Sequence, residues 1–144
     1  MAVDRTDLGF LLALASRRWN DALERRFAAA GFAEVRASYG ALLVPLYEED
    51  GLRMSELARR ARLSKQTLTT MARLLERDGL IVREADATDA RATRLVLTER
   101  ARAFEAVAAG VLAELDAEVT DALGNARASQ LKRSLLELLD LQPG

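Results

Sequence analysis

Residues 64–79, SKQTLTTMARLLERDG, decide the fold because they predict a capped helix with one apolar and one polar face. Four apolar residues recur at helical spacing and predict the buried face: Leu68, Met71, Ala72 and Leu75. Ser64 is a typical N-cap residue, and Gly79 is typical of the position just beyond a helix C-terminus. We therefore expect a helix from Lys65 to Arg77.

The polar face of this helix has the side chains that a DNA-reading helix needs. Its outward residues are amides, hydroxyls and cations: Lys65, Gln66, Thr67, Thr69, Thr70 and Arg73. Glutamine pairs with adenine, arginine pairs with guanine, and a threonine methyl contacts thymine. Ser64 and the N-terminal amides can hold a phosphate, and no acidic residue precedes Glu76 to repel one. The alternative is an ordinary solvated face, but threonine forms exposed helices less well than glutamate or lysine.

The neighbouring segments predict the rest of a DNA-binding motif. Residues 55–63, SELARRARL, predict a short helix capped by Ser55, followed by a tight turn. Two β-prone runs, residues 80–82 and 94–97, bracket a charged loop and predict a hairpin with a long tip. The order of helix, turn, helix and hairpin indicates a winged helix-turn-helix, in which the hairpin is the wing.

The wing carries its own candidates for DNA contact. Arg91 lies near the tip, with Arg83 and Arg94 lower down, and a minor groove attracts such guanidinium groups. Asp89 lies two residues before Arg91 and can pair with it, which would aim the guanidinium. The alternative is a surface loop with incidental charges. Three acidic residues weaken the local positive field: Glu84, Asp86 and Asp89.

Composition narrows the classes of function. The net charge is −1, but residues 53–102 carry a net charge of +5, whereas residues 1–52 carry −2 and residues 103–144 carry −4. This asymmetry is typical of a localised surface for a polyanion. The chain has no cysteine and no histidine, which excludes disulfides and Ser-His or Cys-His catalysis and disfavours a zinc site. Glu48 and Glu49 form a carboxylate pair without a pocket signal, so we expect no enzyme, cofactor, metal site or catalytic residue.

The N-terminal apolar run predicts neither a membrane span nor a leader. LGFLLALA, residues 8–15, is far shorter than the roughly 20 residues that cross a bilayer. Asp4 and Asp7 flank Arg5, whereas a signal peptide begins with net positive charge. We therefore expect a cytoplasmic protein without a membrane partner.

The two ends of the chain predict long helices that need a partner. Apolar residues recur at helical spacing over residues 6–30, and again after Thr98, the expected N-cap of a long helix. These apolar stripes are wider than one small winged domain covers, and exposed stripes usually mark an interface. We expect a mainly α fold with a small β-hairpin wing: residues 35–102 form the DNA-binding domain, and residues 1–34 and 103–144 form a helical dimerisation region.

Two motifs resemble the MarR family of winged-helix transcription regulators. MSELARRARLSKQTLTTMARLLERDGLIVRE, residues 54–84, is followed by a D-x-R pair, Asp89 and Arg91, and by LVLT, residues 95–98. The resemblance covers nearly the whole chain. This sequence departs from the pattern of the family at Ala90, where the family often has another basic residue, and at Ala101, where it often has glycine.

The resemblance implies a homodimer whose first, fifth and sixth helices intertwine, with two reading helices roughly 34–36 Å apart on a pseudo-palindromic operator. It also implies a small, often aromatic or anionic effector, for which the candidate lining residues are Trp19, Tyr39 and Tyr47. The expected function is a sequence-specific, ligand-responsive DNA-binding repressor. The alternative is a winged-helix module that binds protein or RNA without reading DNA sequence.

Overall fold

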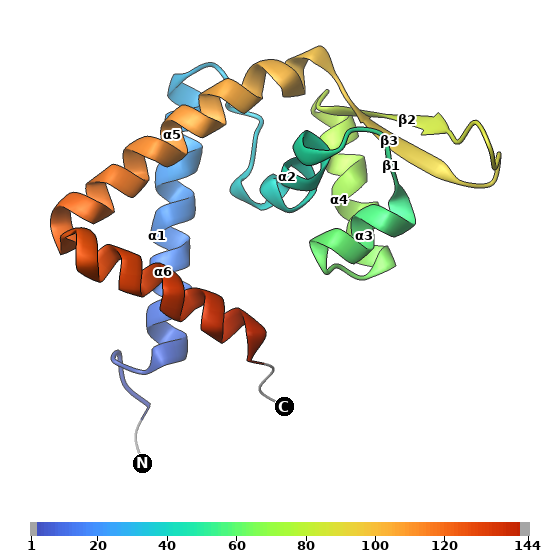
Figure 1. Cartoon of the computed structure of the whole chain (residues 1–144). Coiled ribbons are helices and arrows are strands. Elements are labelled where there is room, and N and C mark those ends of the chain that lie inside the picture. Colours follow the sequence, from blue (N-terminus) through green and yellow to red (C-terminus); the bar gives the residue numbers. More distant parts are fainter. Residues whose placement is uncertain (1–2, 142–144) are drawn as a thin grey trace. The chain divides into compact units, whose positions relative to one another are not determined.

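A computed structural model describes residues 3–141. The chain forms two compact units, Met1–Ala108 and Ala109–Gly144. In the first unit the elements follow in this order: α1 (Leu8–Ala29), a 3-10 turn η1 (Ala37–Tyr39), α2 (Gly40–Glu48), β1 (Leu52–Arg53), α3 (Met54–Ala61), α4 (Lys65–Arg77), β2 (Ile81–Ala85), β3 (Thr93–Leu97) and the first part of α5 (Glu99–Leu123) (Figure 1). The second unit contains the rest of α5 and α6 (Asn125–Asp140).

Helix α4 has the bounds that its capping residues predict. The Ser64 hydroxyl oxygen accepts a hydrogen bond from the Thr67 amide at 3.1 Å, so Ser64 caps the helix as expected. Gly79 follows the helix with a φ of 77°, a left-handed conformation that favours glycine. Leu68, Ala72 and Leu75 are buried as predicted, whereas Met71 is only half-buried.

The predicted cap of the preceding helix is wrong. α3 begins at Met54, one residue before Ser55, and its N-cap is Arg53, which makes no side-chain capping bond. Arg53 already belongs to β1, so the chain passes directly from extended backbone into the helix. The α3–α4 turn follows at Arg62, which has a φ of 55°.

The wing is a three-stranded antiparallel sheet with the order β1-β3-β2. β2 and β3 pair from Ile81 opposite Leu97 to Ala85 opposite Thr93, so the hairpin is longer than the sequence predicted. β1 was not predicted, because two residues are too short to show an alternating pattern; its Leu52 pairs with Leu95. In Figure 1 the hairpin projects beyond the pair formed by α3 and α4.

A leucine-rich core holds the winged part of the first unit together. Its fully buried side chains come from α2, α3, α4, the sheet and the residue just before β2: Leu42, Leu46, Leu57, Leu68, Leu75, Leu80, Ile81 and Leu95. Phe104 of α5 packs edge-on against Phe27 of α1, with ring centroids 4.7 Å apart. The Arg100 guanidinium lies 4.0 Å from the centre of the Phe32 ring. These contacts hold α1 and the loop that follows it against the start of α5.

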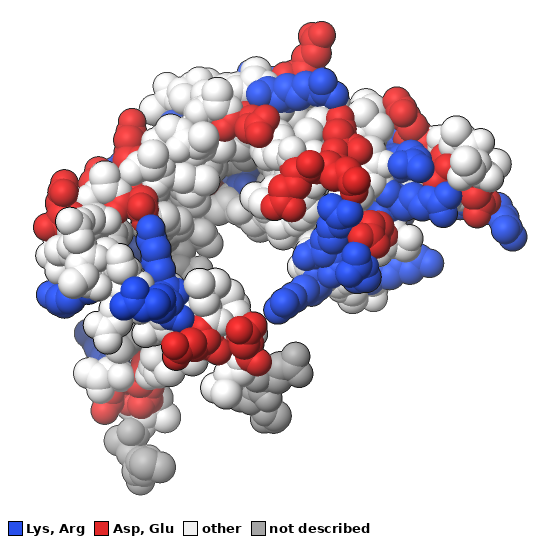
Figure 2. Space-filling view, viewed as in Figure 1, with Lys and Arg blue, Asp and Glu red and all other residues white. Residues whose placement is uncertain are grey.

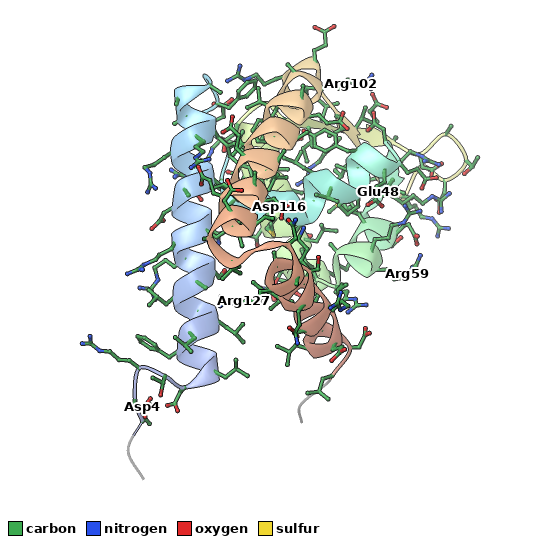
Figure 3. The ribbon with its side chains drawn as sticks, turned by 60° about the vertical axis from the view of Figure 1, so that its left-hand side comes forward. Asp4, Glu48, Arg59, Arg102, Asp116 and Arg127 are labelled. Carbon is green, nitrogen blue, oxygen red and sulfur yellow. The ribbon has the colours of Figure 1, made fainter. Side chains whose placement is uncertain are left out.

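The terminal helices leave many large apolar side chains exposed. On α1 these are Leu8, Phe10, Leu11 and Leu12. On α6 they are Leu131, Leu135, Leu136, Leu138 and Leu139. Within the second unit, Gly124 separates α5 from α6, and Lys132 pairs with Asp116 at 2.9 Å; Figure 3 marks Asp116. Within residues 3–141, no helix is long and apolar enough to cross a membrane.

Candidate nucleic-acid interface

The polar face of α4 is exposed along its length. Lys65, Gln66, Thr67, Thr70 and Arg73 are exposed, and Thr69 is half-buried. Five of these residues line one shallow surface hollow: Lys65, Gln66, Thr69, Thr70 and Arg73. The structure therefore brings together the residues that the sequence predicted to read bases.

The threonine hydroxyls on this face already donate within the helix. Thr69 donates its hydroxyl to the Lys65 carbonyl at 2.9 Å, and Thr70 donates to the Gln66 carbonyl at 3.1 Å. Each threonine thus presents a methyl group and an acceptor oxygen outward rather than a free donor. A methyl suits contact with thymine, so van der Waals contact is the role that this geometry gives the two threonines.

The N-terminus of α4 offers donors for an anion. The first amides of a helix have no partner within the helix, and the helix dipole places partial positive charge there. Ser64 is occupied as the cap, and its hydroxyl donates to Thr67 Oγ1 at 2.9 Å. The amides of Lys65 and Gln66, together with the Lys65 ammonium, are therefore the groups that can hold a phosphate at this end.

At the wing tip, Arg91 is the most exposed candidate. Its side chain is 93% exposed, and its Nε lies 3.3 Å from the Asp89 carboxylate, which confirms the predicted pair. The same carboxylate oxygen accepts from the Arg91 amide at 3.0 Å. Because one oxygen holds both backbone and side chain, Asp89 orients the tip. Arg83, lower on β2, lies 3.6 Å from Glu76 of α4 and so links the wing to the reading helix.

A buried carboxylate anchors the wing at the outer end of β2, where the tip loop begins. The Asp86 side chain is fully buried and accepts hydrogen bonds from the Thr88 amide at 2.8 Å and from the Thr88 hydroxyl at 2.9 Å. The guanidinium groups of Arg53 and Arg94 both pair with it, the latter at 3.3 Å. The Thr88 bonds, followed by Arg53, hold the pKa of Asp86 well below its usual range.

This network corrects two expectations for single residues. Asp86 was expected to weaken the positive field of the wing. Its carboxylate is instead buried, and two arginines neutralise its charge. Arg94 also donates to the Gly51 carbonyl at 2.7 Å, so its guanidinium helps to hold the sheet of the wing together. Arg53 shares this role and was missed by the sequence analysis, because nothing in the spacing of β1 pointed to the distant partner.

A second carboxylate ties the wing to the start of α5. Asp50 accepts from the Leu97 amide at 2.9 Å through one oxygen and pairs with Arg102 at 2.8 Å through the other. Figure 3 marks Arg102. Asp50 therefore fixes β3 against the first turns of α5, a role that the sequence did not reveal.

Further cations lie on α3, next to the reading helix. Glu56 pairs with Arg59 and with Arg60, and Arg60 also pairs with Glu49 at 2.7 Å. Hydrogen bonds from Arg59, then from Arg60, lower the pKa of Glu56 to about 2. Figure 3 marks Arg59, and Figure 2 shows lysine and arginine side chains gathered over α3 and along the wing.

The three aromatic effector candidates differ in accessibility, since Tyr39 is buried and Trp19 and Tyr47 are half-buried. Tyr39 is 2% exposed and donates its hydroxyl to Asp78 at 2.5 Å. Tyr47 donates to the Ala101 carbonyl at 2.6 Å, and burial, then the nearby charge of Glu105, raises its pKa to about 12. Trp19 is half-buried on α1. A hollow beside α1 is lined by Asp21, Glu24, Arg25, Ala28, Ala33 and Arg36.

Comparison with known sequences points to one family. The sequence model of the MarR family matches residues 38–93 of this chain. A curated relative, named an HTH-type transcriptional repressor and found in Mycobacterium bovis, is 34% identical over 93 residues. These residues make up 65% of this chain and 67% of the relative.

Two solved structures share the fold over nearly the whole chain. A transcriptional regulator from M. tuberculosis in complex with DNA is 28% identical and has a TM-score of 0.72, with 91% of this chain and 92% of that chain covered. The repressor CouR, bound to a 23-mer DNA duplex, is 23% identical and has a TM-score of 0.79, with 96% of this chain and 99% of that chain covered.

Proposed function

Because the chain belongs to the MarR family, we propose that it is a sequence-specific DNA-binding transcriptional repressor that acts as a homodimer on a pseudo-palindromic operator. The observation that carries this proposal is the exposed face of α4, where Lys65 and Arg73 lie outward beside Gln66 and the threonines. The relatives named as repressors support repression over activation. The members of the family named here are regulators rather than enzymes.

On this proposal α4 enters the major groove. Gln66 and Arg73 contact base edges, and the methyl groups of Thr69 and Thr70 contact thymine methyls. The Lys65 ammonium and the amides of Lys65 and Gln66 contact phosphates, which fix the register of the helix on the duplex. Ser64 and Thr67, also predicted to contact DNA, support this end of the helix through the cap.

The wing then reaches the neighbouring minor groove. Arg91 inserts its exposed guanidinium, and Asp89 orients it. Arg83 and Arg94 lie farther from the tip, where each is already paired with a carboxylate. They support the position of the wing and add positive charge beside the phosphates.

The exposed apolar side chains of α1 and α6 support the dimer. Monomeric proteins rarely leave large contiguous apolar patches in water. We propose that residues 1–34 and 103–144 form the dimerisation region and residues 35–102 the DNA-binding domain. Two-fold symmetry then places the two copies of α4 on successive major grooves, roughly 34–36 Å apart.

The proposal extends to an effector and a location. A small aromatic or anionic effector would favour a dimer with another helix spacing. Of its candidate lining residues, Trp19 and Tyr47 are half-buried, whereas Tyr39 is buried and could line the site only after a rearrangement. By linkage, such an effector lowers DNA affinity by the same factor by which DNA lowers affinity for the effector. A regulator that acts on the operator belongs in the cytoplasm, in keeping with the expectation from the N-terminal sequence.

The direct test is binding to duplex DNA at several salt concentrations. Fragments are first selected from a random pool that includes the region upstream of the protein's own gene. The proposal predicts a preferred fragment and a steep fall of log affinity with log salt, because phosphate contacts release counterions. An affinity that does not change with salt, or that is the same for all fragments, contradicts the proposal. Either result favours the alternative, a winged-helix module that binds protein rather than a DNA sequence.

Replacement of Arg73 tests the reading role of α4. Arg73→Ala should reduce the difference in binding free energy between operator and random DNA by about 1–3 kcal/mol if Arg73 pairs with a guanine. Arg77→Ala is the control, because Arg77 lies on the same helix but pairs with Asp78 at 3.1 Å. Equal losses for operator and random DNA in the Arg73 variant would make Arg73 a phosphate contact instead.

A further inference from the structure

Arg62, in the turn between α3 and α4, has an unusual backbone for an arginine. Its φ of 55° and ψ of 41° are left-handed, which L-residues other than glycine, asparagine and aspartate seldom adopt. At the other described positions with positive φ the chain has glycine: Gly31, Gly51, Gly79 and Gly124. The turn needs this conformation, because it lets the Leu63 amide donate to the Ala58 carbonyl at 3.0 Å and so ends α3. Arginine is therefore not the residue that the turn itself favours.

The Arg62 side chain is also unusual in having no ion pair. From residue 36 to residue 102, most basic residues pair with a carboxylate of the same unit: Arg36, Arg53, Arg59, Arg60, Arg77, Arg83, Arg91, Arg94, Arg100 and Arg102. Over this described range the basic residues left without such a partner are Arg62, Lys65 and Arg73. Two of these three form the ends of the reading face, and Arg62 precedes Lys65 by three residues. The unpaired cations thus mark α4 and the turn that leads into it.

We infer that Arg62 is a phosphate-binding residue of the DNA interface, outside both the reading helix and the wing. In a helix-turn-helix the first helix crosses the DNA backbone and the second enters the groove. The turn that joins them therefore lies at the edge of the groove, beside the phosphates rather than the bases. An exposed guanidinium without a carboxylate partner is free to contact them.

This inference rests on the proposed DNA binding, and its test uses one variant that removes the charge of Arg62 and another that keeps it. Arg62→Asn removes the charge but keeps a residue that adopts the left-handed conformation more readily than arginine. The melting temperature should therefore stay or rise while DNA affinity falls severalfold. Arg62→Lys keeps a charge at this position and should retain most of the affinity.

The measurements are fluorescence anisotropy with an operator duplex and a random duplex over a range of salt. For Arg62→Asn we expect equal fold losses on both duplexes and a salt slope that is shallower by about one. Arg25→Asn, which removes an exposed arginine from α1, should leave the salt slope unchanged.

Three outcomes would overturn the assignment or its premise. An Arg62→Asn salt slope equal to that of the wild type shows that Arg62 does not contact phosphate. A selective loss on the operator makes it a base-reading residue. If the wild type itself binds duplex DNA without salt dependence, the proposed function fails, which is distinct from the failure of Arg62 alone.

Discussion

At the scale of single residues, Asp86 shows how a buried charge can shape an exposed surface. Its carboxylate draws together Thr88 and the arginines of β1 and β3, so that groups distant in the chain share one anchor. Removing one partner of such a buried cluster leaves the others uncompensated. The position of the wing therefore depends on a residue that DNA never contacts.

Replacement of Asp86 should show a defined pH dependence. Because its folded pKa lies below the unfolded value of about 3.9, the carboxylate stabilises the fold above about pH 4, and this contribution is lost as pH falls through the folded value. Asp86→Asn should lower the free energy of unfolding at neutral pH. The difference in this free energy between the variant and the wild type should become smaller as the pH falls below about 4. Urea unfolding from pH 7 to pH 2.5 measures both.

The control for this prediction is Glu84→Gln, which changes an exposed carboxylate two residues earlier, on β2. It should unfold like the wild type across the range. A gap between Asp86→Asn and the wild type that stays constant into acid would mean that the asparagine acts through packing rather than through the lost charge.

At the scale of elements, the capping of α4 is separable from DNA contact. Ser64→Ala removes the bond to the Thr67 amide and should cost about 0.5–2 kcal/mol of stability. Ser64→Asp keeps a capping oxygen but adds a negative charge where a phosphate would lie, so it should fold well and bind DNA weakly. Urea unfolding and duplex binding, measured on both variants, separate the two effects. Parallel losses of stability and affinity in Ser64→Asp would refute this separation.

The wing makes an independent prediction at the same scale. Arg91→Ala should weaken operator binding by about 1–3 kcal/mol if the guanidinium makes a good groove contact. Stability should not change, because an exposed ion pair contributes little. Anisotropy at moderate salt measures the affinity, and an unchanged value would reduce the wing to a passive loop. Asp89→Asn tests the orienting role and should give a smaller loss than Arg91→Ala.

How far the sequence predicts an element depends on whether its signal is local. The bounds of α4 follow from Ser64, Gly79 and a helical apolar pattern, all within one segment. β1 gives no such signal, since its two residues become a strand only by pairing with β3. The same holds for the site: the outward face of α4 follows from periodicity, whereas the Asp86 and Asp50 networks join residues more than thirty positions apart.

At the scale of the whole molecule, the apolar side chains of α6 make the dimer testable. Leu135→Asp places a charge in the proposed interface and removes a leucine from each subunit. The expected cost is about 3–6 kcal/mol per dimer, counting about 1.5–3 kcal/mol for each leucine. Sedimentation should show a monomer at concentrations where the wild type is a dimer, with weaker operator binding because only one half-site is engaged.

Gln130→Asp is the matched control on the same helix, since it adds the same single negative charge at an exposed polar position. It should remain a dimer. A dimeric Leu135→Asp variant would mean that other surfaces join the subunits and that the exposed leucines of α6 serve another contact.

The anchoring of the wing just below its tip also affects which residues of such a regulator can change during evolution. Asp86, Arg53 and Arg94 secure the strands below the tip, and Asp89 organises the tip by local bonds alone. Apart from Thr88, whose hydroxyl bonds the buried Asp86, the residues from 87 to 92 can therefore be substituted without disturbing the leucine core. Descendant proteins can acquire new operator preferences through this short span while inheriting the same scaffold, which makes the wing tip the natural place for lineages to diverge.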